Sequence, residues 1–133
     1  MSSFRRVTDS FWVSPQISVD DVAEAKAQGF EVIINNRPDG EAPDQPAGAE
    51  IAAAARAAGL EYLDAPVSGR PSPQAVQAVA DATADPSKKV LAFCRSGTRS
   101  ISTWAMGQAG RRETDELVRL GADAGYDLRA VVG

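Results

Sequence analysis

The sequence contains no histidine and a single cysteine among its 133 residues. The absence of histidine excludes Cys–His and Ser–His–Asp catalysis, and it also excludes any histidine-ligated metal site. A lone thiol cannot complete a closed metal site either, so we expect neither a metal nor another cofactor. One cysteine cannot form an internal disulfide, which suits a reducing compartment. The sequence therefore predicts a cytoplasmic protein.

Long apolar runs and an excess of positive charge are missing as well. No stretch approaches the ~20 apolar residues that span a bilayer, and the first residues, Met1 to Arg6, lack the hydrophobic core of a signal peptide. The formal net charge of −4 argues against general nucleic-acid binding. We therefore expect neither a membrane nor a nucleic acid as partner, and the sequence leaves the oligomeric state open.

Length and patterning together indicate the fold class. The hydrophobic content of 44% and charged content of 24% are ordinary for a globular protein, and the length fits one domain over residues 1–133. Short β-prone segments alternate with helical ones along the chain. This alternation predicts an α/β fold in three layers, with a central, mostly parallel sheet and helices on both faces.

The expected elements follow from caps, turns and apolar runs. Strands are predicted at residues 4–7, 11–13, 30–35, 60–65 and in the segment just before Cys94. Helices are predicted at residues 18–29, 47–58, 72 to about 85, 100–108 and 113–124. Residues 36–46 form a loop because three prolines and several turn residues interrupt any regular period. Residues 128–133 are too short to classify.

The cysteine lies where the last predicted strand meets a helix, in Cys94-Arg95-Ser96-Gly97-Thr98-Arg99-Ser100. At such a junction, loop N–H groups and the positive end of the helix dipole favour the thiolate form. The two arginines of the segment add positive charge. The alternative is a small buried apolar cysteine, since free cysteine is among the most buried residue types. The arginines, hydroxyls and glycine around it favour the reactive thiolate.

Roles follow for each residue of this segment. Cys94 is the predicted nucleophile, and Arg99 can place its fork on two oxygens of a bound anion. Ser100 is expected to donate a hydrogen bond to the sulfur, and Gly97 allows the chain to turn closely. Arg95 has a surface ion pair as an alternative role. The predicted oxyanion cradle consists of the backbone N–H groups of Arg95, Ser96, Gly97, Thr98 and Arg99.

Charged residues after the strand at 30–35 are further candidates. Asp39 follows the sheet edge where ligands usually bind α/β proteins, and it is the candidate general acid. A structural role in a Pro-Asp-Gly turn is the alternative. Arg37 is expected to hold a second anionic group, with a salt bridge to Asp39 or Glu41 as the alternative. Glu41 is interpreted as a solvated loop charge, and Asp64 as the acceptor of a structural hydrogen bond.

Three separated motifs carry a resemblance to known families. The segment from Cys94 to Ser100 resembles the active loop of rhodanese-type sulfurtransferases and, less closely, the phosphate loop of protein tyrosine phosphatases. Together with Asn35-Asn36-Arg37-Pro38-Asp39-Gly40 and Tyr62-Leu63-Asp64-Ala65-Pro66-Val67, it resembles the beta-lactamase-hydrolase-like phosphatase domain family. That resemblance covers nearly the whole chain. It implies a single phosphatase-like domain with a dual-specificity-phosphatase-like fold.

The sequence departs from ordinary tyrosine phosphatases at three points. Ordinary tyrosine phosphatases have a Cys-x5-Arg motif preceded by histidine. This chain has a Cys-x4-Arg motif preceded by Phe93. Their general acid is expected just after the Pro66-Val67 pair, where this chain has Ser68-Gly69. A positioned proton donor typically contributes about 10²–10⁴-fold. The acid must therefore come from elsewhere, or the leaving group must be a good one.

Three functions stay open, each with a small anionic substrate or a phosphorylated molecule as partner. The resemblance along the chain favours a cysteine-dependent phosphatase-type hydrolase that cleaves phosphate monoesters through a Cys94 phosphocysteine. The short loop and the missing acid favour a rhodanese-type sulfurtransferase that carries a Cys94 persulfide. The third possible function is a non-catalytic anion-binding module. The intact Cys-Arg-Ser set argues against it, because a module that only binds anions does not need a nucleophile. We predict the phosphatase-type hydrolase.

Overall fold

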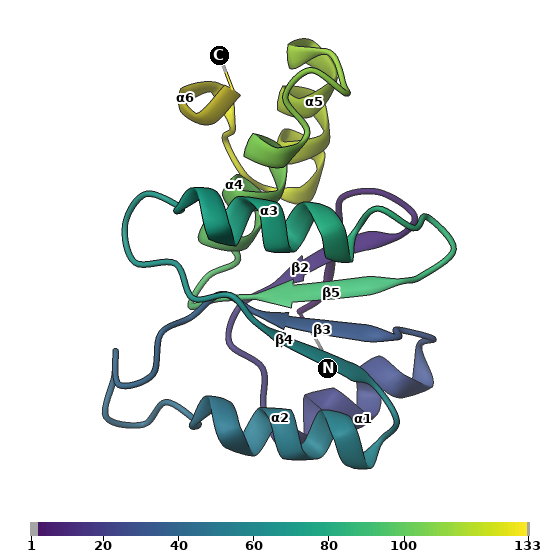
Figure 1. Cartoon of the computed structure of the whole chain (residues 1–133), viewed down its shortest axis with the longest axis vertical. Helices are drawn as coiled ribbons and strands as arrows, with labels where there is room; N and C mark the ends of the chain where they lie inside the picture. Colours follow the sequence, from purple (N-terminus) through teal and green to yellow (C-terminus); the bar gives the residue numbers. More distant parts are fainter. Residues whose placement is uncertain (1–2, 133) are drawn as a thin grey trace.

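A five-stranded sheet organises the computed structural model, which describes residues 3–132 (Figure 1). Across the sheet the strands run in the order β1-β2-β5-β3-β4, and only the edge pair β1–β2 is antiparallel. The prediction of a mostly parallel sheet is therefore confirmed. The strands are β1 (Arg5–Arg6), β2 (Phe11–Ser14), β3 (Val32–Asn35), β4 (Glu61–Asp64) and β5 (Val90–Phe93).

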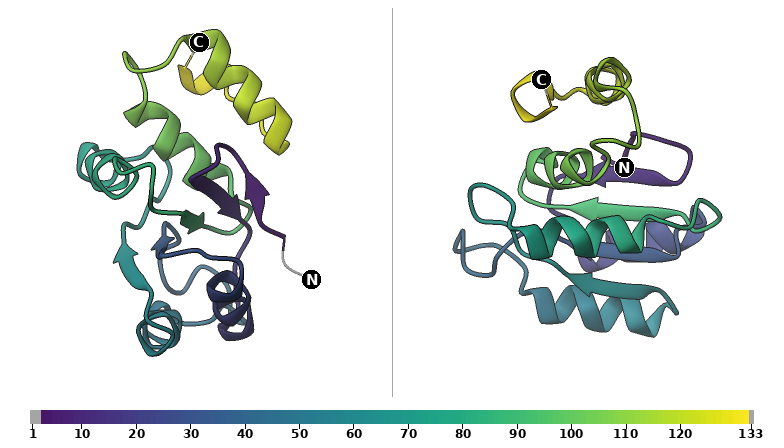
Figure 2. Two further views of the ribbon diagram at one scale, coloured as in Figure 1. Left: turned by 90° about the vertical axis from the view of Figure 1, so that its right-hand side faces the viewer. Right: turned by 45° about the horizontal axis from the view of Figure 1, so that its top comes forward.

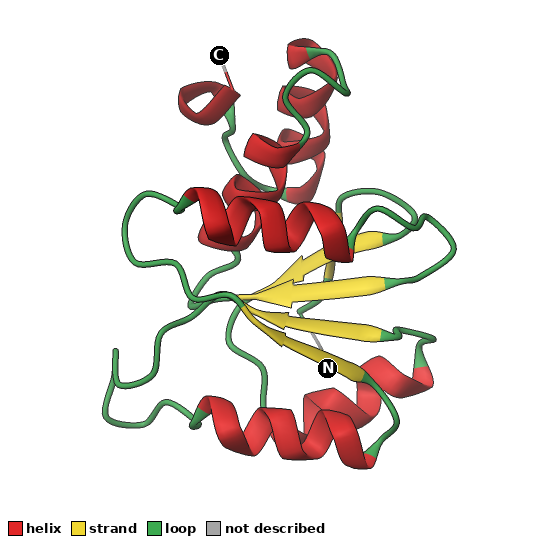
Figure 3. Ribbon diagram, viewed as in Figure 1, coloured by secondary structure: helices red, strands yellow, loops and turns green. Residues whose placement is uncertain are grey.

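The central strands explain where the cysteine lies. All residues of β3 and β5 are buried, as expected for parallel strands covered on both faces. Their ends are level, because Asn35 pairs with Phe93 on one side and with Asp64 on the other. The loops after β3, β4 and β5 therefore leave the sheet side by side (Figure 3). Cys94 follows the strand in the middle of this edge.

Helices α1 (Val19–Ala27) and α2 (Gly48–Ala57) cover one face of the sheet (Figure 1). Ser18 starts α1 with a capping box: its hydroxyl accepts from the Asp21 N–H, and the Asp21 carboxylate accepts from the Ser18 N–H. Ile33, Leu91 and Phe93 are fully buried in the core beneath these helices. The local cap at Ser18 is why the start of α1 was predictable.

The opposite face carries α3 (Pro73–Ala82) and α4 (Thr98–Gly107), and α5 (Thr114–Ala124) and α6 (Arg129–Val132) lie outside α4 (Figure 2). Helix α3 ends at Ala82, before the predicted end near residue 85. Helix α4 begins at Thr98 rather than Ser100, because Gly97 adopts a left-handed conformation and caps it. Residues 128–132, unclassified by sequence, include α6, and Gly133 lies outside the described residues. Within residues 3–132, no helix is long and apolar enough to cross a bilayer.

Candidate active site

The sulfur of Cys94 lies inside the loop that joins β5 to α4. Cys94 is fully buried, and its Sγ accepts a hydrogen bond from the Gly97 N–H at 3.1 Å. On the strand side, the Cys94 N–H donates to the carbonyl of Ser14 at 3.4 Å. The first N–H groups of a helix lack intrahelical acceptors and carry the positive end of its dipole. The sulfur therefore accepts from one amide, that of Gly97 just before α4, at the junction where the sequence predicted a cradle of amides.

Gly97 is required by both its backbone and its surroundings. Its φ of +92° is in the left-handed region, and a Cβ there would lie 2.1 Å from the Tyr126 hydroxyl. That hydroxyl donates to the carbonyl of Ser96 at 2.8 Å. Tyr126 follows α5, so the C-terminal helices help to fix the shape of the loop. No local sequence signal pointed to Tyr126.

The side chains of Ser96, Thr98 and Ser100 make contacts other than the predicted ones. The Ser96 and Thr98 hydroxyls bond to each other at 3.0 Å, and Arg95 is exposed, with its carbonyl accepting from the Gln16 N–H. The predicted hydrogen bond from Ser100 to the sulfur is absent. Instead the Ser100 Oγ is buried without a hydrogen-bond partner. The reason is that α4 starts early, which places Ser100 in its first turn on the buried side.

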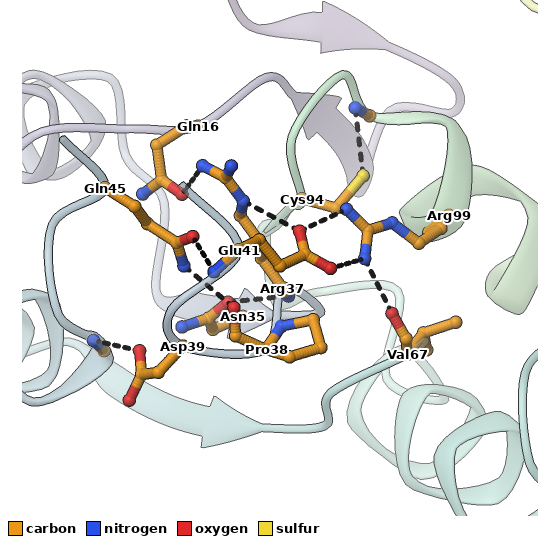
Figure 4. Close-up of polar contacts among 12 residues, drawn as sticks. Gln16, Asn35, Arg37, Pro38, Asp39, Glu41, Gln45, Val67, Cys94 and Arg99 are labelled. Atoms are coloured by element: carbon orange, nitrogen blue, oxygen red, sulfur yellow. Dashed lines mark hydrogen bonds and ion pairs between the residues drawn. The ribbon is translucent and has the colours of Figure 1, made fainter. Parts of the chain in front are cut away.

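Arg99 turns toward Glu41 rather than toward bulk water (Figure 4). Its Nη1 donates to the Glu41 Oε2 at 2.7 Å, and its Nη2 donates to Oε1 at 2.8 Å. Nη1 also donates to the carbonyl of Val67 at 2.8 Å. The hydrogen bond to Glu41 raises the pKa of Arg99, and the neighbouring Cys94 acts in the same direction.

The contacts to Glu41 and Val67 leave one edge of the guanidinium unused, and Arg99 also interacts with Cys94. An arginine has five N–H donors, and the contacts above use both hydrogens of Nη1 and one of Nη2. The Nε–H and the second Nη2 hydrogen remain, and these two point in parallel along the other edge. Parallel donors of this kind match two oxygens of one anion. Glu41 and Val67 therefore orient Arg99 without consuming its anion-binding edge.

Glu41 also pairs with Arg37, the second predicted anion-binding residue. The Arg37 Nε donates to the Glu41 Oε1 at 3.0 Å, and Nη1 donates to the Gln16 Oε1 at 3.1 Å. Arg37 is only 4% exposed. The salt-bridge alternative is the one that the structure shows.

The carboxylate of Glu41 cannot serve as a proton donor at neutral pH. The hydrogen bond from Arg99, reinforced by Arg37, lowers the pKa of Glu41 to about 2. Glu41 is an exposed loop residue, as interpreted from the sequence, but that interpretation missed its ion pairs with Arg37 and Arg99. No local sequence signal pointed to these ion pairs, which arise because the strand register brings the loop after β3 beside the loop after β5.

Hydrogen bonds within residues 36–46 fix the position of Glu41. The Gln45 Oε1 accepts from the Glu41 N–H at 3.0 Å, and the Gln45 Nε2 donates to the Pro38 carbonyl at 2.9 Å. At the start of the loop, the Arg37 N–H donates to the Asn35 Oδ1 at 2.8 Å. The loop is therefore held by side chains, although it has no regular structure.

The structure does not bring Asp39 to Cys94. The Asp39 Oδ1 accepts from the Gly48 N–H at 2.8 Å and so caps α2, and Figure 4 shows this carboxylate pointing away from Cys94 and Arg99. Asp39 lines a separate pocket with Asp64 and Tyr62. Partial burial, followed by the charge of Asp39, raises the pKa of Asp64. This pocket lies at the start of α2, on the face of the sheet opposite α4. Among residues 3–132, no three metal-ligating side chains gather.

Comparison with known proteins covers most of the chain. The family described as beta-lactamase hydrolase-like protein, phosphatase-like domain, matches residues 3–111. A beta-lactamase hydrolase-like protein of Agrobacterium fabrum (strain C58) is 36% identical over 128 residues, which are 94% of this chain and 30% of that protein. The chain thus spans less than a third of the length of the curated relatives it matches.

Solved structures show the same architecture. The crystal structure of a proposed phosphatase from Neisseria meningitidis Z2491 is 28% identical, with a TM-score of 0.84 over 98% of this chain and 94% of that one. A kinase-associated phosphatase whose catalytic-site cysteine was replaced by serine has a TM-score of 0.72 at 14% identity, over 94% of this chain and 83% of that one. The second likeness shows the fold alone. The fold is that of the cysteine phosphatases, which confirms the predicted fold class.

Proposed function

Because this chain belongs to the family of beta-lactamase hydrolase-like phosphatase-like domains, we propose that it is a phosphatase-type hydrolase with Cys94 as its nucleophile. One observation carries the proposal: the Cys94 Sγ lies at the start of α4, with the Gly97 N–H on it and the guanidinium of Arg99 beside it. A thiolate next to amides and a fixed cation can attack an anionic electrophile.

In the proposed reaction, a phosphate monoester binds with its oxygens on the loop amides and on the free edge of Arg99. The Cys94 thiolate attacks phosphorus, the bond from phosphorus to the leaving-group oxygen breaks, and the leaving group departs as an oxyanion. Water then attacks the phosphocysteine, which releases inorganic phosphate and a proton and restores the thiolate.

Proton supply limits the range of substrates. Glu41 is ionised at neutral pH, and Asp39 is bonded to the Gly48 N–H, so we do not assign either of them the proton transfer. Leaving groups that need no proton are then favoured. Because a positioned acid typically contributes about 10²–10⁴-fold, we expect aryl phosphates to react faster than alkyl phosphates by a factor of that order.

Turnover of an aryl phosphate by the wild type and by Cys94→Ser tests the proposal. We expect the substitution to abolish phosphate release, and acid quenching followed by mass spectrometry to trap phosphocysteine in the wild type only. Arg111→Ala is a matched control, because Arg111 is exposed and lies outside the loop. Undiminished turnover in Cys94→Ser would refute the proposed nucleophile.

A second candidate, sulfur transfer, is favoured by one observation: the ionised Glu41 is the carboxylate held at the loop, and sulfur transfer needs no acid there. In this reaction the Cys94 thiolate attacks the outer sulfur of thiosulfate, the S–S bond breaks, and sulfite leaves. Cyanide then takes the sulfur from the persulfide to give thiocyanate. The same preparations, given thiosulfate and cyanide, decide between the two. Thiocyanate formation without phosphate release would replace the hydrolase assignment, and failure of both reactions with anion binding retained would favour the binding module.

A further inference from the structure

A groove of about 270 Å³ adjoins the cysteine loop on the α4 side of the sheet. Arg70 and Pro71, in the loop after β4, line this groove. Ser102 and Met106 of α4 and Val131 of α6 line it as well. Three separate parts of the chain therefore shape this groove.

The groove is continuous with the proposed anion site. Thr98 and Arg99 line it, and both belong to the start of α4, next to Cys94. The Arg99 Nη1 donates to the carbonyl of Val67 at 2.8 Å, which ties the loop after β4 to α4. A group attached to an anion held by Arg99 would therefore extend along α4 toward Met106.

The lining combines apolar surface with unpaired positive charge. Pro71, Met106 and Val131 are apolar and half-buried, whereas Arg70 is exposed and has no ion-pair partner among the described residues. No acidic side chain lines the groove. An engineered apolar cavity of about 150 Å³ holds a benzene molecule. The volume here accommodates one ring and a charged substituent.

We propose that this groove binds the organic part of the substrate, and that it selects small anions with an apolar ring or chain and a second, carboxylate charge. Met106 provides the apolar contact and Arg70 the preference for the carboxylate. The inference rests on the proposed function for the place of the first anion.

Calorimetric titration with three phosphonates that cannot be hydrolysed tests the inference. The ligands are 4-carboxybenzylphosphonate, benzylphosphonate and 4-(aminomethyl)benzylphosphonate, and we expect affinity for the wild type to fall in that order. Arg70→Ala should remove the advantage of the carboxylate, about five-fold, which corresponds to the ~1 kcal/mol of a good exposed ion pair. Met106→Ala should weaken all three ligands and leave methylphosphonate unchanged.

Arg111→Ala is the matched control, since it removes an exposed arginine that does not line the groove. Its affinities should equal those of the wild type. If the ratios of the affinities for the three benzylphosphonates were the same in the wild type and in Arg70→Ala, the proposed selectivity of the groove would be refuted. The proposed anion site would not be affected by that result. Failure of the phosphonates and of inorganic phosphate to bind at all would overturn both this inference and the proposed function.

Discussion

Asp39 and Glu41 are near neighbours in one loop, yet they belong to two different regions of the molecule. The Asp39 region lies at the start of α2, where the carboxylate caps the helix and lies beside Asp64. The Glu41 region lies at the cysteine loop, where the carboxylate joins Arg37 and Arg99. The two regions have opposite electrostatics: arginines lower the pKa of Glu41 to about 2, whereas burial and Asp39 raise that of Asp64.

The comparison shows that the partners of a carboxylate, not its place in the sequence, decide its chemistry. The carboxylate beside the sulfur has lost its ability to donate a proton and has become a structural anchor for Arg99. The carboxyl group whose pKa is raised lies on the opposite face of the sheet. Neither region therefore provides a protonated acid to Cys94, which is why the leaving group should dominate the rate.

The largest effect is expected when the two regions are compared by activity. Arg99→Lys keeps the charge but loses the fork that holds Glu41 and an anion at once, and we expect kcat/KM to fall about 10²–10³-fold. Asp39→Ala should change kcat/KM less than three-fold, because it removes only the cap of α2, worth about 1 kcal/mol of stability. Steady-state kinetics with an aryl phosphate measure kcat/KM of both variants, and urea unfolding measures the stability loss in Asp39→Ala. If Asp39→Ala lost as much activity as Arg99→Lys, the result would support the sequence-based prediction that Asp39 is the general acid.

A smaller effect is expected on stability when Glu41 loses its charge. Glu41→Gln leaves Arg37, which is 4% exposed, with amide acceptors only, and we expect a loss of about 1–3 kcal/mol in the free energy of unfolding. Urea unfolding monitored by tryptophan fluorescence measures it. Asp44→Asn is a control from the same loop, since Asp44 is exposed and forms no ion pair among the described residues. Equal stability of the two variants would show that the buried arginine does not depend on Glu41.

Much of the scaffold was predictable because its signals are local. The caps at Ser18 and Ser72 lie within a few residues of the helices they start, and Gly97 marks the turn after Cys94. The contacts that complete the site are not local. Glu41 and Arg99 are 58 positions apart, and the Tyr126 hydroxyl bonds to a residue 30 positions away. Such pairs follow from strand register and helix packing, which a single sequence does not display.

The pH dependence of stability sharpens the contrast further. The folded pKa of Glu41, about 2, lies below the ordinary value of 4.5, so its contribution is fully present above pH 4.5 and is lost as the pH falls through about 2. The stability difference between the wild type and Glu41→Gln should therefore be constant from pH 7 to about 5 and shrink below that. Urea titrations at each pH measure it. A difference that disappears above pH 5 would contradict the pairing with the two arginines.

The contribution of Asp64 to stability should change with pH in the opposite direction to that of Glu41. It should also be the smallest of the expected effects. Because its folded pKa is raised, the native state binds its proton more readily than the unfolded chain does, and charged Asp64 costs stability above that pKa. Asp64→Asn should therefore stabilise the protein at neutral pH, by at most about 0.5 kcal/mol since the residue is exposed, and this gain should vanish in acid. In Asp39→Ala the gain at neutral pH should be smaller but should not vanish, because the charge of Asp39 is gone while partial burial, the larger cause, remains. If the gain were as large in the Asp39→Ala background as in the wild type, the charge of Asp39 would not contribute to the raised pKa of Asp64, and partial burial alone would account for it.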